Sequence, residues 1–293
     1  MESGTIIEHY GHRGRILCFE NRKDFFPVNR DQSLLMASNA LIEALNYAGR
    51  SAKPLEELRA VEICCGGGPA AIVLKDAGVG FVEASDLNPL ALEMTRRNAA
   101  LNGLTLDRLV VRDLLGLPRR AEECFDLVVC NPPCARRIQL TEPISPHMRM
   151  AVDGGLDGVD IVLSLIVSAR QHLVPGGCLI FMLTSSMDFR QVIHMLDGEF
   201  RGNWRLAYAT PVAQPYVDKS RSWADSVAEL VEERRIFVWE GEDGWLWRLA
   251  WIIVATNLPT RKGAPLGRLW FHPYGCNIAA TSYWETLPHF EHG

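Results

Sequence analysis

Carboxylates and glycines that could hold a nucleotide-like ligand follow three successive apolar runs of the sequence. The runs end in Val61-Glu-Ile-Cys-Cys-Gly-Gly-Gly-Pro69, in Glu83-Ala-Ser-Asp-Leu-Asn-Pro89 and in Val111-Arg-Asp-Leu114. A glycine-dense turn after a strand lets a ligand approach the backbone closely. In the second run, Asp86 could accept both hydroxyls of a ribose, and in the third, Asp113 could accept from an adenine amino group. The order of these residues predicts a nucleoside-binding site.

A fourth apolar run ends in Asn131-Pro-Pro-Cys134, which could hold an amine or amide nitrogen. Pro132 forces Asn131 into an extended conformation, and Pro133 does the same to Pro132. The Asn131 side-chain oxygen and the Pro132 backbone oxygen are then two fixed acceptors for one N–H₂ group. Hydrogen bonds to both hydrogens would fix the direction of the nitrogen lone pair. The loop would therefore increase the reaction rate by orienting the nucleophile. We therefore predict that Asn131, Pro132, Pro133 and Cys134 form the catalytic site.

Alternating apolar runs and helical stretches must position these residues. The expected strands are 60–64, 80–85, 109–112, 127–130 and 178–183, and the expected helices are 31–49, 69–77, 88–102 and 159–173. We expect the first helix to stop at Gly49. Runs that are apolar on both faces and separated by helices predict parallel strands covered on two sides. The predicted fold class is therefore α/β, doubly wound.

The ends of the chain differ in composition. All eight Trp residues lie after residue 200, whereas seven of the eight Cys residues lie before residue 179. In the Trp-rich part we expect a strand at 206–212, a helix at 223–233, and a β-hairpin formed by 235–240 and 245–256. Another strand is expected at 15–19. The resulting domain prediction is an N-terminal extension (1–52), a catalytic domain (53–258) and a C-terminal arm or lid (259–293).

The glycine turn (Glu62–Gly68), Asp86, Asp113 and Asn131–Cys134 together resemble the class I S-adenosylmethionine (SAM) dependent methyltransferases, in the branch that methylates nitrogen through an Asn-Pro-Pro-aromatic loop. Val152-Asp-Gly-Gly-Leu-Asp-Gly-Val-Asp160 and Val174-Pro-Gly-Gly177 are similar to HemK-like protein-glutamine methyltransferases. The resemblance covers roughly residues 55–200, together with Phe26-Pro27. It implies a mostly parallel, seven-stranded Rossmann-like sheet with a C-terminal antiparallel hairpin.

The resemblance also implies SAM as the cofactor and no metal, because the leaving group is a neutral thioether. Asp86 would hold the ribose and Asp113 the adenine, while Asn131 and Pro132 would orient the acceptor nitrogen. Gly66 and Gly68 would pass close to the methionine part of SAM, with Glu62 supporting their loop. The residues expected to contact the cofactor are Glu62, Cys64, Gly66, Gly68, Asp86, Leu87, Asp113, Leu114 and Asn131.

Three departures from the family pattern bear on the acceptor. Cys64 stands where the family has its first glycine, and Cys134 replaces the aromatic residue that stacks on a planar acceptor. The loss of that aromatic disfavours a nucleobase. About 50 residues precede the fold, fewer than the multi-helix domain with which HemK-like enzymes grip release factors. We therefore expect the Trp-rich C-terminal segment to provide acceptor recognition.

Charge and composition indicate the cellular compartment and disfavour nucleic acid and membranes as partners. The 293 residues include 30 Lys and Arg against 35 Asp and Glu, a net charge of −5 that disfavours non-specific binding to nucleic acid. The Cys residues show no paired spacing and are expected to be reduced thiols. The N-terminus has no apolar stretch like that of a signal peptide, and no later run is long enough to span a bilayer. We expect a cytoplasmic protein without a membrane partner.

We thus expect a SAM-dependent methyltransferase that acts on a nitrogen of a small molecule, amino acid or peptide, in natural-product tailoring. Two alternatives remain: a base methyltransferase of rRNA, tRNA or DNA, and a SAM-using protein that does not methylate. His147 could serve as a base, and Arg136 and Arg137 could bind an acidic acceptor. Ordinary surface positions are the simpler interpretation of all three.

Overall fold

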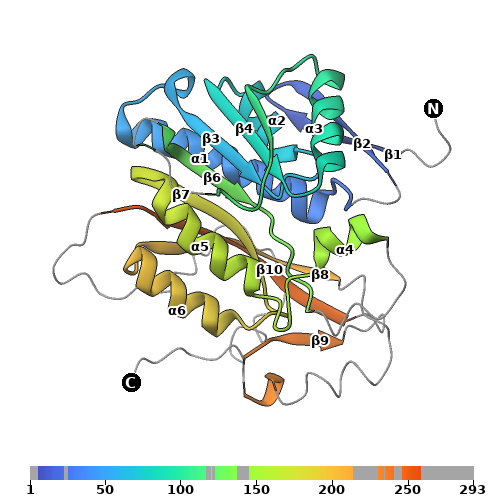
Figure 1. Cartoon of the computed structure of the whole chain (residues 1–293), viewed down its shortest axis with the longest axis vertical. Coiled ribbons are helices and arrows are strands. Elements are labelled where there is room, and N and C mark those ends of the chain that lie inside the picture. Colours follow the sequence, from blue (N-terminus) through green and yellow to red (C-terminus); the bar gives the residue numbers. More distant parts are fainter. Residues whose placement is uncertain are drawn as a thin grey trace.

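An eight-stranded sheet forms the centre of the molecule (Figure 1). The computed structural model describes residues 6–22, 26–116, 120, 123–136, 145–213, 230–233, 235–240 and 246–258. Along the sheet the strands follow the order β5-β4-β3-β6-β7-β10-β8, with β9 paired to β10. Their bounds are β3 Arg59–Ile63, β4 Phe81–Asp86, β5 Arg108–Val111, β6 Phe125–Cys130, β7 Leu173–Thr184, β8 Trp204–Ala213, β9 Val238–Glu240 and β10 Leu246–Thr256.

Five of these strands, from β5 to β7, run parallel, and β10 is antiparallel to both β7 and β8. The predicted doubly wound α/β sheet with an antiparallel C-terminal hairpin is therefore confirmed. In that hairpin Leu246 pairs with Glu240, while its turn lies outside the described residues. The same holds for most of the predicted helix at 223–233 and for the segment 259–293. The domain boundaries at 52/53 and 258/259 stay predictions.

Helices cover both faces of the sheet, as the two-sided apolar runs require. Three helices, α1 Leu35–Ser51, α2 Pro69–Asp76 and α3 Pro89–Leu101, pack on one face, and α5 Asp160–His172 and α6 Phe189–Phe200 lie side by side on the other (Figure 1). In β3, Ala60 belongs to the first core, whereas Val61 and Ile63 belong to the second. The alternation of side chains along a strand thus explains why these runs are apolar throughout.

The first helix differs from its prediction at both ends. Asn29 caps a single π-helical turn, Arg30–Leu34, and α1 begins only at Leu35. Gly49 does not stop the helix, which continues to Ser51 and ends at Ala52 with φ +54°. Gly49 lies on the exposed face of the helix, where a Cβ would meet no atom within 4 Å. The helix continues through this glycine, although glycine lowers helix stability by about 1 kcal/mol relative to alanine.

An N-terminal hairpin, β1 Ile6–His12 and β2 Arg15–Asn21, packs on α3 (Figure 1). The structure confirms the strand predicted at 15–19, but β1, α6 and the short α4 Pro146–Val152 lie outside the predicted set. Asn98 of α3 is fully buried and joins the hairpin to the glycine turn: it accepts from the Glu20 N–H at 2.7 Å and donates to the Gly67 carbonyl at 2.9 Å.

Within the described residues, no helix has both the length and the apolar character needed to cross a bilayer.

Replacing Asn98 by Ala should lower the free energy of unfolding by about 2 kcal/mol, because buried backbone groups of two segments lose their partner. Urea unfolding measures the loss. Arg96→Ala, on the exposed face of the same helix, should change stability by less than about 0.5 kcal/mol. Equal effects of the two substitutions would show that the asparagine does not join the hairpin to the turn.

Candidate functional site

A cavity opens at the carboxyl ends of β3, β4, β5 and β6. It is lined by all of the predicted site residues except Gly68: Glu62, Cys64, Gly66, Asp86, Leu87, Asp113, Leu114, Asn131, Pro132, Pro133 and Cys134. The structure therefore brings together residues that are up to 72 positions apart in the chain, from Glu62 to Cys134. Parallel pairing causes this convergence, because the turns that follow parallel neighbours leave the sheet at one edge.

Hydrogen bonds tie the glycine turn to the end of β4. The Cys65 N–H donates to the Ser85 carbonyl at 3.1 Å, and the Gly66 N–H donates to the Asp86 carboxylate at 3.0 Å. The other oxygen of Asp86 accepts from the Asn88 N–H at 2.9 Å. Burial raises the pKa of the Asp86 carboxyl above its ordinary value, and these backbone N–H groups oppose that rise. Asp86 thus has a fixed orientation at the cavity wall.

The turn itself needs left-handed backbone at three positions: Cys64 has φ +52°, Gly66 φ +53° and Gly68 φ +74°. At Cys64, a side chain in this backbone region costs on the order of 1 kcal/mol. Gly68 does not line the cavity. A Cβ there would lie 2.5 Å from the Thr95 side chain, so this glycine permits close packing between the start of α2 and α3.

Glu62 lies beneath the turn and caps α2. Its carboxylate accepts from the Ala71 N–H at 2.7 Å and from the Ala70 N–H at 3.3 Å. Gly68, the N-cap residue, has no side chain for this task, so a buried acid from β3 supplies the acceptor. Burial raises the pKa of the Glu62 carboxyl to about 8, with a smaller contribution from the charge of Asp86, and the two N–H groups partly oppose the rise.

An ion pair with a buried carboxylate holds the residues that follow β5. Arg112 pairs with Glu83, which is fully buried, and its Nε donates to the Leu114 carbonyl at 3.0 Å. Leu114 has φ +45°, so this bond supports an unfavourable turn conformation. Asp113 is exposed at the cavity rim. Leu87 and Leu114 form an apolar wall beside the Asp113 carboxylate. This arrangement suits a planar nucleobase, whose faces are apolar and whose edge carries hydrogen-bond donors.

The glycines of Val152–Asp160 brace the loop Asn131–Cys134, which is called the acceptor loop below. The Ala135 N–H donates to the Val152 carbonyl, and the Gly154 N–H donates to the Ala135 carbonyl, both at 2.8 Å. A Cβ on Gly154 would lie 2.8 Å from the Cys134 Cα and 2.9 Å from the Pro133 carbonyl oxygen. The absence of a side chain at Gly154 therefore allows this segment to support the backbone of the acceptor loop directly.

Segments outside the four motifs complete the cavity. The additional lining residues come from the segment before α1, from α1, α3, α4 and α5 and from β10, and include Phe26, Val28, Met36, Met150, Ile161 and Arg248. Phe26 falls on the proline turn named in the family resemblance, but no pattern in the sequence singles out Met36, Ile161 or Arg248. They reach the cavity through tertiary packing alone.

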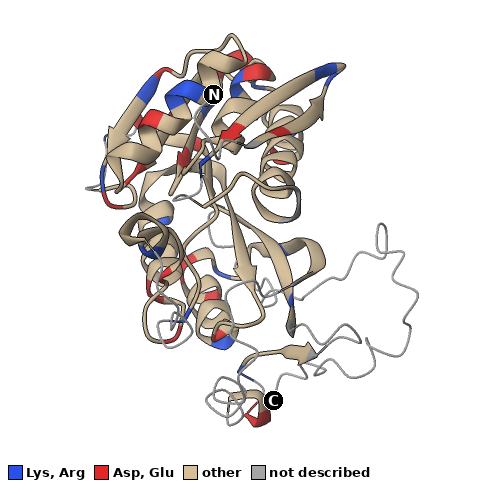
Figure 2. Cartoon of the chain, turned by 90° about the vertical axis from the view of Figure 1, so that its right-hand side faces the viewer, with Lys and Arg blue, Asp and Glu red and all other residues tan. Residues whose placement is uncertain are grey.

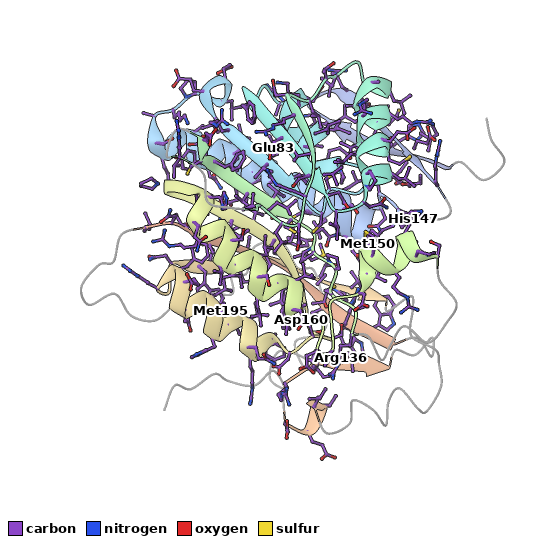
Figure 3. All side chains as sticks on the ribbon, viewed as in Figure 1. Glu83, Arg136, His147, Met150, Asp160 and Met195 are labelled. Atoms are coloured by element: carbon purple, nitrogen blue, oxygen red, sulfur yellow. The ribbon has the colours of Figure 1, made fainter. Side chains whose placement is uncertain are left out.

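The additional candidate residues have different positions. His147 and Met150 both project from α4 (Figure 3), and the His147 Nδ1 lies 3.3 Å from the Asn88 Nδ2 at the cavity wall. Arg136 does not line the cavity: it is buried and pairs with Asp157 at 3.2 Å. Arg137 lies outside the described residues. In the described ranges no group of three or more His, Cys, Asp or Glu residues has the arrangement of a metal site.

A family model described as "Methyltransferase small domain" matches residues 30–207, a range that contains all the predicted site residues. Among curated proteins, the chain is similar to the ribosomal protein uL3 glutamine methyltransferase of Bordetella pertussis, with 34% identity over 142 residues, 46% of either chain. It is also similar to the release factor glutamine methyltransferase of Deinococcus radiodurans, with 34% identity over 143 residues, 47% of this chain and 50% of the relative. The chain spans about half the length of these relatives.

A solved structure supports the fold. The Thermus thermophilus 16S rRNA N2 methyltransferase RsmC, in complex with AdoMet and guanosine, matches with a TM-score of 0.52 and 14% identity, covering 87% of this chain and 51% of that one. At this identity the likeness concerns the fold alone. Natural-product tailoring, the expected context, finds no support in the comparisons, since these curated relatives are named for glutamine methylation.

The raised pKa of Glu62 predicts that SAM binding releases protons. The folded-state pKa, about 8, lies above the ordinary value of 4.5, so Glu62 favours the folded state below pH 4.5 and this contribution is lost as the pH rises to about 8. A sulfonium cation in the cavity favours the ionised carboxylate, so near neutral pH binding should release a large fraction of one proton. Calorimetry in two buffers of different ionisation enthalpy measures this release.

Glu62→Gln is the control for that experiment, because an amide cannot release the proton. The interpretation is wrong if wild-type SAM binding gives the same heat in both buffers, since binding would then release no proton.

Substituting Gly154 by Ala should displace the acceptor loop while leaving the cofactor half of the cavity intact. We expect the rate of the predicted methyl transfer to fall by about 100-fold, the order of loss caused by a misplacement of about 1 Å. SAM affinity should change by less than about threefold, because only the acceptor half is displaced. Gly198→Ala, in α6 with open space around its Cβ position, should leave the rate unchanged; an equal loss in both variants would contradict the bracing role.

Proposed function

The chain belongs to the methyltransferase small domain family, whose model matches more than half of its length, and from this premise we propose that it transfers a methyl group from SAM to the side-chain amide nitrogen of a glutamine. The family membership confirms two predictions made from the sequence: the enzyme class, a SAM-dependent methyltransferase, and SAM as the cofactor of that class. The acceptor, the partner protein and the role of each residue are parts of the proposal.

The cavity has the features that SAM requires. The carboxyl groups of Glu62, which is buried, and Asp86, which is half-buried, lie in the wall of one cavity, and in their ionised form they favour a ligand that carries positive charge. The glycine turn presents backbone without side chains at Gly66 and Gly67. Asp86, Leu87, Asp113 and Leu114 would hold the nucleoside, and Glu62 would support the turn beside the methionine part. When bound, SAM supplies an electrophilic methyl group on a sulfonium.

One observation carries the proposal for nitrogen: the Asn131-Pro-Pro-Cys134 loop lines the same cavity as these carboxylates. An amide nitrogen is a poor nucleophile because its lone pair is delocalised, so its orientation matters more than a general base does. The Asn131 side-chain oxygen and the Pro132 carbonyl would accept both amide hydrogens and direct the nitrogen at the methyl group. The proton lost from nitrogen passes to solvent.

The acceptor is proposed as a glutamine in a protein or peptide. This is the group named for both of the curated relatives described above. Cys134, in place of an aromatic residue, offers no ring on which a nucleobase could stack. Lys and Arg residues are interspersed with Asp and Glu residues on the described elements (Figure 2), so the charges support a protein acceptor better than a phosphate backbone.

Asn131→Ala should retain SAM binding and lose turnover. With a short glutaminyl peptide as acceptor, we expect calorimetric SAM affinity within about twofold of wild type and a kcat reduced by about 100-fold or more, because the acceptor nitrogen is no longer oriented. Mass spectrometry of the peptide measures the transfer.

Asn46→Ala is a matched control, since Asn46 is exposed on α1, far from the motif. If wild-type protein binds SAM but methylates no glutaminyl peptide, the glutamine acceptor is wrong. If Asn131→Ala retains full turnover, the orienting role of this residue is wrong.

A further inference from the structure

Arg248 is a buried cation in the wall of the cavity, on a strand that carries none of the motifs. It lies in β10, opposite Val212 of β8 and Val238 of β9, and only 6% of its surface is exposed. Burying a guanidinium is costly unless the site gives it polar partners. Arg248 also lines the cavity, where its guanidinium can contact a ligand.

Two buried hydroxyls hold one end of this guanidinium. The Arg248 Nη1 donates to the Ser186 Oγ at 3.1 Å and to the Thr184 Oγ1 at 3.4 Å. The two hydroxyl oxygens lie 3.2 Å apart, and both residues are 1% exposed. Thr184 ends β7, at the same carboxyl edge of the sheet as the acceptor loop, so the cluster of Arg248, Thr184 and Ser186 is built into the sheet and is not a mobile surface feature.

The same cluster reaches the acceptor loop at the position where the family pattern is broken. The Thr184 Oγ1 donates to the Cys134 Sγ at 3.9 Å. Cys134 and Arg248 both line the cavity. A small thiol at residue 134 therefore leaves the acceptor half of the cavity bordered by a cation, where an aromatic ring would otherwise provide an apolar surface.

We propose that Arg248 is a specificity-determining residue that binds a carboxylate of the acceptor, so that the preferred substrate is a glutamine with an anionic group close to its side-chain amide. This inference rests on the proposed glutamine acceptor. The guanidinium is planar and pre-oriented by the two hydroxyls, which suits a charge-assisted bond to a carboxylate. Because the site is desolvated, the bond discriminates strongly against a neutral acceptor. The carboxylate could be the α-carboxylate of a terminal glutamine or the side chain of a neighbouring residue.

Two pairs of probes separate these sources. The first pair is N-acetyl-glutamine and its C-terminal amide, which differ only in the α-carboxylate. The second pair is acetyl-glutaminyl-aspartyl amide and acetyl-glutaminyl-asparaginyl amide, which differ only in a neighbouring side chain. For wild-type protein we expect kcat/KM to be about tenfold or more higher for the anionic member of one pair. The pair that shows the preference identifies the source.

Arg248→Gln should abolish that preference. We expect KM for the anionic probe to rise by about tenfold with kcat within about threefold, and the neutral probe to change by less than about twofold. Arg248→Lys should restore part of the preference, because it keeps the charge but loses the planar fork. Arg149→Gln, an exposed position on α4, should match wild type, and SAM affinity should be the same in all variants, which shows that they fold.

Binding is measured separately from transfer by calorimetry, with N-acetyl-glutamine and the aspartyl probe added to the complex with S-adenosylhomocysteine. Absence of methyl transfer to all four probes contradicts the proposed glutamine acceptor. In that case, weaker binding of an anionic probe to Arg248→Gln than to wild type still supports the carboxylate site. Equal kcat/KM within both pairs, or equal binding of the anionic probes to wild type and Arg248→Gln, overturns the role of Arg248.

Discussion

The parallel pairing of β3 between β4 and β6 is the constraint on which the cavity depends. It sets Ile63 opposite both Ser85 and Cys130, so that the residues after all three strands leave the sheet together. The glycine turn, the Asp86 carboxylate and the acceptor loop are neighbours for that reason alone. A shift of one residue in this register would exchange the two faces of β3 and place Glu62 on the wrong side of the sheet.

Two braces then fix the halves of the cavity independently. On the cofactor side, Asn98 connects the N-terminal hairpin to the glycine turn, and Glu62 caps α2 from below. On the acceptor side, the backbone of Gly154 supports Pro133 and Cys134 at a distance that no side chain permits. Because the braces share no residue, a change in one half leaves the other intact, and cofactor binding can be separated experimentally from acceptor positioning.

Local patterns predicted every strand except β1, together with α2, α3, α5 and the motif residues, because each depends on neighbours in sequence: a two-sided apolar run, a proline after a cap, a glycine-dense turn. The start of α1 was not predictable in this way, since the π turn at Arg30–Leu34 depends on the Asn29 cap and its packing. The contact role of Gly68 toward the cofactor stays a prediction, whereas its close packing against Thr95 is visible only in the folded chain. No sequence pattern predicted that Arg248 lines the cavity. A single cation in an apolar strand could lie anywhere on the sheet, and only the folded structure shows that it borders the site.

The central claim is that one cavity holds the cofactor against Asp86 and an amide nitrogen against Asn131 and Pro132. A crystal structure of the chain with S-adenosylhomocysteine and a glutaminyl peptide tests it most directly. The account predicts that the cofactor product contacts Asp86, with the peptide amide nitrogen within hydrogen-bond distance of the Asn131 side-chain oxygen and the Pro132 carbonyl. A complex in which the product binds elsewhere, or in which the side-chain amide turns away from both oxygens, would contradict it.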